Sequence, residues 1–254
     1  MSPLAVSGVV FACIAGAGLL AMAVARALPE HHLKPDSKEA IKYGLTLIAT
    51  LAALVLGLLI AAAKGTYDTQ TTAVRQLSAD ALLLDRILAL YGKETGEARE
   101  LLRRAVASAL DRLWPGDSTR PANLAPGGEA RADMEAFYEK VAGLTPQNEA
   151  QRALKARALD VTAGLAQTRF RLFAQKDSSV PVPFLVVLVF WLMVLLGGAG
   201  LLAPNNATVV GVLLVCALSV SSALFLILEL DRPFEGILRV PSAPLREALA
   251  RLGN

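Results

Sequence analysis

Long runs of apolar residues without any charge dominate the pattern of this chain. Residues 178–228 form one such run, 51 residues rich in Leu, Val, Ala and Phe. A helix of roughly 20 residues crosses a bilayer core about 30 Å thick. The run is therefore long enough for two crossings. The sequence Pro204-Asn205-Asn206 near its middle is typical of a turn that reverses the chain.

Two further charge-free runs lie near the N-terminus, at residues 3–25 and 43–63. In lipid a helix satisfies its own backbone hydrogen bonds, so each run predicts a membrane helix. The alternative for the first run is a cleaved signal peptide, but it has no Lys or Arg before its apolar core and the core is long. We predict an all-α protein whose four transmembrane helices form two hairpins, at about 4–26 with 41–64 and 180–203 with 207–229.

Residues 65–178 have a different, polar character. Apolar residues recur there at spacings of three and four, which predicts several amphipathic helices. The region holds 16 Lys or Arg and 15 Asp or Glu, so it lacks the one-signed basic surface of a nucleic-acid-binding protein. We predict four parts: a transmembrane hairpin (1–64), a helical aqueous domain (65–178), a second hairpin (179–230) and a C-terminal tail with a short amphipathic helix after Ser242 (231–254).

Composition supports a membrane protein and gives little sign of chemistry. The chain is 54% hydrophobic with a mean hydropathy of +0.49. Its two cysteines lack metal-ligand spacing, and no catalytic or phosphate-binding motif is present. The adjacent His31 and His32 could bind a metal weakly or sense pH, but their polar neighbours favour an ordinary solvated loop. The carboxylates of the polar region lie among basic neighbours, as solvated charges do. We therefore expect no enzyme activity, catalytic residue, cofactor or metal site.

One face of the second membrane helix carries small or polar residues. Thr46, Thr50, Gly57 and Lys64 follow each other at helical spacing, with Ala53 and Ala61 between them. Such a stripe can line a water-filled pore. It can equally form a close contact between helices, where small residues are enriched. Both interpretations stay open from the sequence.

The most distinctive local sequence follows the fourth membrane helix. Acidic side chains at a membrane helix end are costly to bury and often mark ion routes or fixed pairs. Proline there ends the helix, and glycine permits a tight turn. The segment is either a helix stop with an interfacial anchor or a part of an ion path. Its residues are Glu229, Asp231, Arg232, Pro233, Phe234 and Gly236.

This segment also carries a family resemblance. The sequence Asp231-Arg232-Pro233-Phe234, followed by Gly236 and by Pro241-Ser242-x-Pro244-Leu245, resembles the C-terminal signature of a bacterial and plant membrane family described as bestrophin-like. The passage out of the second membrane helix, residues 57–67 and 79–81, is similar to that of the same family. The layout of the whole chain is similar as well.

The resemblance implies an oligomeric anion channel, because true bestrophins are pentameric anion channels with a basic-aromatic motif just after the second membrane helix. Here the comparable stretch is 64–69, in which only Lys64 and Tyr67 match that motif. No pore or calcium-site residue is carried over from the family. The competing hypothesis is a non-conducting scaffold or sensor whose helical domain binds a cytoplasmic partner.

The distribution of Lys and Arg predicts the orientation. With four crossings, the polar domain and both termini lie on one side of the membrane. Basic residues near the membrane ends are about twice as frequent on that side, which places the domain in the cytoplasm under the positive-inside rule. Together with the resemblance, this predicts a protein of the bacterial inner membrane that contacts lipid and forms a homo-oligomer. The residues counted are Lys64, Arg75, Arg169, Arg171, Lys176, Arg232 and Arg239 against Arg26, Lys34, Lys38 and Lys42.

Overall fold

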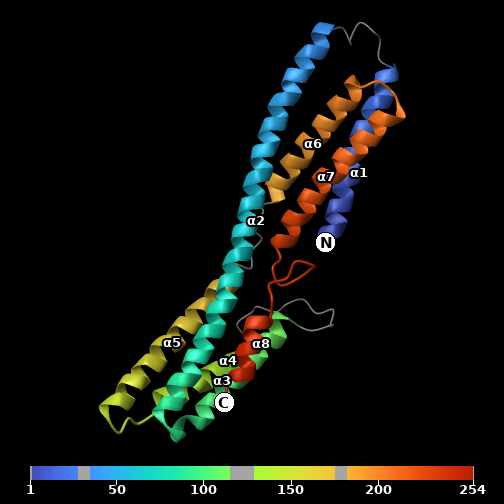
Figure 1. The fold of residues 1–254 in the computed structure, drawn as a ribbon. Helices are drawn as coiled ribbons and strands as arrows, with labels where there is room; N and C mark the ends of the chain where they lie inside the picture. Colours follow the sequence, from blue (N-terminus) through green and yellow to red (C-terminus); the bar gives the residue numbers. More distant parts are fainter. Residues whose placement is uncertain (1, 28–34, 115–128, 175–181, 254) are drawn as a thin grey trace. The chain divides into compact units, whose positions relative to one another are not determined.

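The computed structural model describes residues 2–27, 35–114, 129–174 and 182–253, and all regular elements in these ranges are helices (Figure 1). The all-α prediction is therefore confirmed. The chain divides into two compact units. Unit 1 comprises Met1–Thr66 and Ser178–Arg232, and unit 2 comprises Tyr67–Asp177 and Pro233–Asn254.

Unit 1 contains the apolar helices. Four helices of the described chain are long and apolar enough to cross a membrane, as the sequence predicts. They are α1 (Pro3–Ala27), α2 (Pro35–Tyr91), α6 (Val182–Leu202) and α7 (Ala207–Leu230), of which α2 extends beyond the unit. Figure 1 shows α1, α6 and α7 running side by side, and α1 packs on both of the others. The division into two hairpins remains a prediction.

The turn between α6 and α7 is built by Asn206. Its side-chain oxygen accepts a hydrogen bond from the backbone N–H of Val209 at 2.8 Å, which caps the first turn of α7. Its own N–H donates to the carbonyl of Pro204 at 3.0 Å. The cap satisfies a backbone donor that would otherwise lack a partner at the end of a membrane helix.

Two glycines allow α1 and α6 to approach closely. A Cβ atom built at Gly200 would lie 2.3 Å from the carbonyl oxygen of Gly18, which is less than any real contact of this kind. Around this seam Ile14, Met22 and Leu192 are buried. Small residues serve such contacts in membranes because they let helix backbones pack at short distance.

We expect the substitution Gly200→Ala to destabilise unit 1, because the added methyl group forces α1 and α6 apart. Overpacking of this kind costs about 1–3 kcal/mol, which exceeds the gain of about 1 kcal/mol that alanine brings to a helix. Thermal unfolding in detergent micelles measures the difference. Gly211→Ala in α7 is the matched control, since outside its own stretch of helix no atom of the described residues lies within 4 Å of its Cβ position. Equal stability of the two variants would contradict the assignment of the seam.

Unit 2 is a bundle of amphipathic helices around its own core. It contains the C-terminal part of α2, a short 3-10 helix η2 (Lys93–Thr95), α3 (Gly96–Leu113), α4 (Glu129–Ala142), α5 (Glu149–Ala174) and α8 (Ala243–Arg251). Leu84, Leu102 and Phe137 are fully buried at its centre. The helix α8 buries Leu245 and Ala248 in the same unit, and Ser242 precedes it without a side-chain cap.

Candidate functional site

The small and polar stripe on α2 lies on the surface of the chain. Thr46, Thr50, Gly57 and Lys64 are all exposed. Outside its own stretch of helix, no atom of the described residues lies within 4 Å of a Cβ built at Gly57. The buried face of the same helix is formed instead by Ala52, Leu59 and Ala63. Within the described part of one chain, the stripe is therefore not a packing seam.

The two threonine hydroxyls of the stripe bond to their own helix. Thr46 donates to the carbonyl of Lys42, and Thr50 donates to the carbonyl of Thr46, each at 2.9 Å. Such bonds to the preceding turn satisfy the hydroxyl proton in an apolar surrounding. The hydroxyl oxygens keep lone pairs that can accept hydrogen bonds.

A second exposed flank of α2 has the opposite character. Leu47, Leu51, Leu54 and Leu58 are between 41% and 67% exposed and follow each other at spacings of three and four. Large aliphatic side chains are what a lipid-facing helix surface requires. The exposed surface of α2 thus divides into a leucine flank suited to lipid and the stripe of small and polar residues beside it.

The C-terminal segment begins where α7 ends, at Leu230. The N–H of Asp231 still bonds to the carbonyl of Ile227, and the N–H of Arg232 bonds to the carbonyl of Glu229. The Glu229 side chain is buried in unit 1. Residues 233–240 then form a closed loop, because the N–H of Val240 donates to the carbonyl of Pro233 at 2.7 Å. Gly236 turns this loop with a φ of 77°, a conformation that favours glycine.

Aromatic residues of unit 2 hold this loop. Phe234 is buried and contacts Trp114 edge to face, with ring centroids 5.7 Å apart. Trp114 also donates from Nε1 to the carbonyl of Val240 at 2.9 Å, and the Tyr67 hydroxyl donates to the carbonyl of Arg239 at 3.4 Å. The signature residues Pro233, Phe234 and Gly236 thus serve a fixed loop. Glu229, Asp231 and Arg232 belong to unit 1.

We expect Trp114→Phe to loosen this loop, because the change keeps an aromatic ring but leaves the Val240 carbonyl without its donor. An unpaired buried acceptor costs about 1–3 kcal/mol. Faster limited proteolysis between residues 233 and 242 is the measurement. Tyr67→Phe removes a longer hydrogen bond and should have a smaller effect; the reverse order would contradict this account of the loop.

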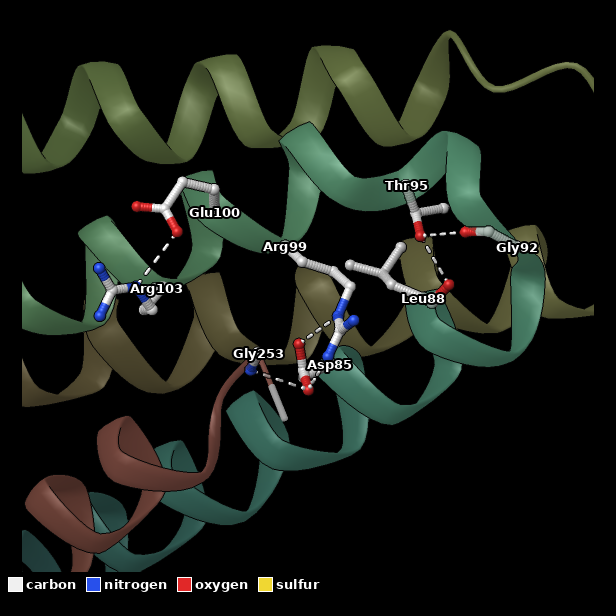
Figure 2. Close-up of polar contacts among 8 residues, drawn as sticks. All are labelled: Asp85, Leu88, Gly92, Thr95, Arg99, Glu100, Arg103 and Gly253. Atoms are coloured by element: carbon white, nitrogen blue, oxygen red, sulfur yellow. Dashed lines mark hydrogen bonds and ion pairs between the residues drawn. The ribbon is translucent and has the colours of Figure 1, made fainter.

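An ion pair inside unit 2 was not anticipated from the sequence. Asp85 of α2 faces Arg99 of α3, with Oδ1 2.7 Å from Nε and Oδ2 2.9 Å from Nη2 (Figure 2). The Asp85 side chain is only 9% exposed. Its Oδ2 also accepts a hydrogen bond from the N–H of Gly253 at 3.4 Å. The carboxylate therefore joins α2, α3 and the end of the chain.

The prediction that all carboxylates of the polar region are solvated is thus wrong for Asp85. The signal was present, because Asp85 follows Ala81 by four residues and precedes Leu88 by three, so it lies on the apolar face of the helix. The hydrogen bond that Arg99 donates to Asp85 raises the pKa of Arg99 above its ordinary value, although burial acts in the opposite direction. The guanidinium is charged at every physiological pH.

The same region holds the turn that joins α2 to α3. Gly92 adopts a φ of 141° after the end of α2. The Thr95 hydroxyl lies 2.7 Å from the carbonyl oxygen of Leu88 and 2.8 Å from that of Gly92 (Figure 2). These contacts satisfy carbonyls at the helix end and fix the direction of α3.

The cysteines and histidines singled out in the sequence lie elsewhere. Cys13 and Cys216 are exposed on α1 and α7, and the pair His31-His32 lies outside the described residues.

Comparison with known proteins gives one family and a consistent fold. Residues 12–245 match the model of the Bestrophin-like domain. Two variants of a bacterial bestrophin homologue from Klebsiella pneumoniae are similar in structure, each 15% identical in sequence. One has a TM-score of 0.72 over 99% of this chain and 97% of that chain, and the other has 0.70 over 96% of each.

A third solved structure, described as a membrane protein, has a TM-score of 0.69 at 15% identity over 97% of each chain. At such identities these similarities concern the fold. The search of curated proteins found no match.

Proposed function

Because this chain belongs to the Bestrophin-like family, we propose that it is an oligomeric ion channel, selective for anions, in which α2 of each copy lines the path. The chain is a multi-pass integral membrane protein with four membrane-spanning helices. The single observation that carries the proposal is the exposed stripe of Thr46, Thr50, Gly57 and Lys64 on α2. We assign the protein no catalytic chemistry and no cofactor.

The stripe supports a path because the packing of a single copy leaves it exposed. Packing within the chain uses the opposite face of α2, and the leucine flank is the surface suited to lipid. A surface with two hydroxyls and a lysine is poorly suited to lipid tails. If the stripe faces other copies across an axis, it contacts either water or a neighbouring helix. Both arrangements require a homo-oligomer.

Lysine supplies the preference for anions. Lys64 is exposed at the end of the charge-free run on α2, and no acidic residue occurs among residues 43–63. A ring of lysines from several copies would create a positive potential, which concentrates anions at the entrance of a path.

Ion flux into liposomes that contain the purified protein tests the proposal, with anion and cation gradients imposed separately. We expect protein-dependent flux driven by the anion gradient. Flux driven by the cation gradient alone would contradict the anion preference. A monodisperse, inserted sample without any flux would contradict the channel itself.

We further propose that unit 2 lies in the cytoplasm and that the membrane is the bacterial inner membrane. The excess of Lys and Arg at the ends of the spans on that side supports this orientation. A cysteine introduced at Lys93 in intact cells should resist a membrane-impermeant thiol reagent and react only after lysis. Reaction in intact cells would reverse the orientation.

A non-conducting scaffold is the second candidate, and one observation favours it. On α2 within unit 2, Leu83 and Leu90 are 41% and 60% exposed, seven residues apart on one face. An exposed aliphatic stripe on an aqueous domain is a surface for a protein partner. A stable partner recovered with the protein, but lost from the variant Leu83→Ser/Leu90→Ser, together with the lack of flux, would favour this candidate.

A further inference from the structure

The loop after α7 presents two aliphatic side chains to its surroundings. Ile237 is 76% exposed and the adjacent Leu238 is 38% exposed. Among the large hydrophobic side chains of the described residues, Ile237 has the highest exposed fraction. The loop therefore keeps apolar surface outward although unit 2 has a core in which Phe234, only three residues earlier, is buried.

The loop holds these side chains in a fixed backbone. The hydrogen bond between Val240 N–H and the Pro233 carbonyl closes its base at 2.7 Å. Within it, the Arg239 Nε donates to the carbonyl of Gly236 at 2.7 Å. Beneath it lies the Phe234–Trp114 contact. Ile237 and Leu238 are thus displayed at the tip of a structured loop whose base is anchored.

Two short stretches of chain connect this loop and its contact residue Tyr67 to membrane helices. Pro233 follows the last residue of the membrane helix α7, Leu230, by three positions. Tyr67, whose hydroxyl bonds to the Arg239 carbonyl, follows the last residue of the charge-free run 43–63 by four positions. Four residues of helix rise by about 6 Å. Tyrosine and tryptophan are also the residues enriched where membrane meets water.

The charges near the tip are balanced. Asp231 and Glu235 offset Arg232 and Arg239, so the segment has no net charge at neutral pH. Attraction to anionic lipid is therefore a minor contribution, and the apolar side chains must supply the affinity. Two side chains also cover much less than the roughly 800 Å² per partner that a stable protein interface buries. A lipid surface has no such minimum area.

We propose that Ile237 and Leu238 insert into the boundary between headgroups and acyl chains of the phospholipid bilayer and hold the loop on the membrane surface. Amphipathic segments bind lipid in this way when apolar side chains enter the interface while charged neighbours stay in water. Arg232 and Arg239, both exposed, can contact phosphate groups from that position. The loop is then a lipid contact in addition to the four membrane helices, whether or not the protein conducts ions.

Site-specific fluorescence in lipid nanodiscs tests the proposal on the full chain. The native cysteines are first replaced, Cys13→Ala and Cys216→Ala, and Ile237→Cys is then labelled with bimane. Leu54→Cys on the leucine flank is the lipid control, and Lys93→Cys in η2 is the water control. Each label is quenched separately by brominated phosphatidylcholine and by iodide in the buffer.

We expect brominated lipid to quench the label at 237 at least half as strongly as the label at 54, and iodide to quench it at least threefold less than the label at 93. These results should change less than twofold when half of the lipid is phosphatidylglycerol. Quenching at 237 that matches the water control would overturn the proposal. Protection from both quenchers would also overturn it, because a contact between copies would then cover the tip.

Discussion

Replacing Gly57 with leucine is expected to reduce ion flux at least tenfold while the protein remains folded. Nothing in the described chain lies within 4 Å of a Cβ built at Gly57, so the side chain adds no clash within one copy. In the proposed path, the same side chain projects from every copy toward the axis. Several leucines at one level would narrow the path and remove water from it, which raises the barrier for an ion.

Gly44→Leu is a closely matched control for this variant. Gly44 lies on the same helix and is exposed, and no described atom outside its own stretch of helix lies within 4 Å of its Cβ position. It precedes Leu47 by three residues and therefore belongs to the leucine flank rather than to the stripe. Flux into liposomes should be unchanged in Gly44→Leu. Equal flux in both variants, from samples of equal oligomeric state, would contradict the proposal that α2 lines the path.

Removing the buried carboxylate with Asp85→Ala is expected to lower the free energy of unfolding by about 2–4 kcal/mol. The change leaves the Arg99 guanidinium facing a buried space and takes the acceptor from the Gly253 N–H. Breaking one partner of a fully buried ion pair costs about 3–5 kcal/mol. The expected loss is somewhat smaller, because the Arg99 side chain is 23% exposed and water can reach it.

This effect is measured by chemical or thermal unfolding of the full chain in micelles, with the loss of helical signal as the readout. Asp160→Ala is the control. Asp160 forms a contact of the same length, 2.7 Å, with Arg157, but both side chains are more than half exposed. Exposed pairs contribute about 0–1 kcal/mol. The double variant Asp85→Leu/Arg99→Met should regain much of the stability, and a double variant as unstable as Asp85→Ala would contradict the pair as the cause.

The membrane helices were predictable because a helix that crosses lipid needs a long run of residues without charge, and such a run can be read directly from the sequence. Charge-free runs at 3–25, 43–63 and 178–228 gave four helices, and Asn206 between the last two gave a cap. Partners across space were not predictable in the same way. The seam of Gly18 and Gly200 joins residues 182 positions apart, and only the helix packing identifies them.

The candidate site was predictable in composition but not in exposure. The stripe on α2 was recognisable from its spacing, yet a pore surface and a packing seam share the same small residues. The structure shows that this face is open in the described chain, whereas the contacts of α2 use Ala52 and Leu59. For the C-terminal signature, proline and glycine indicated a turn, but nothing in the sequence joined Phe234 to Trp114, 120 positions earlier.

The hydrogen bonds of Thr46 and Thr50 have a consequence for how the proposed path treats charge. Each hydroxyl gives its only proton to its own helix, so toward an ion it offers oxygen lone pairs and a methyl group. Oxygen lone pairs attract cations and offer an anion no hydrogen bond. These two threonines therefore do not favour anions, and the sign of the selected ion depends on Lys64 alone within the stripe. A single exchange, Lys64→Glu, would then convert the same wall into one that favours cations.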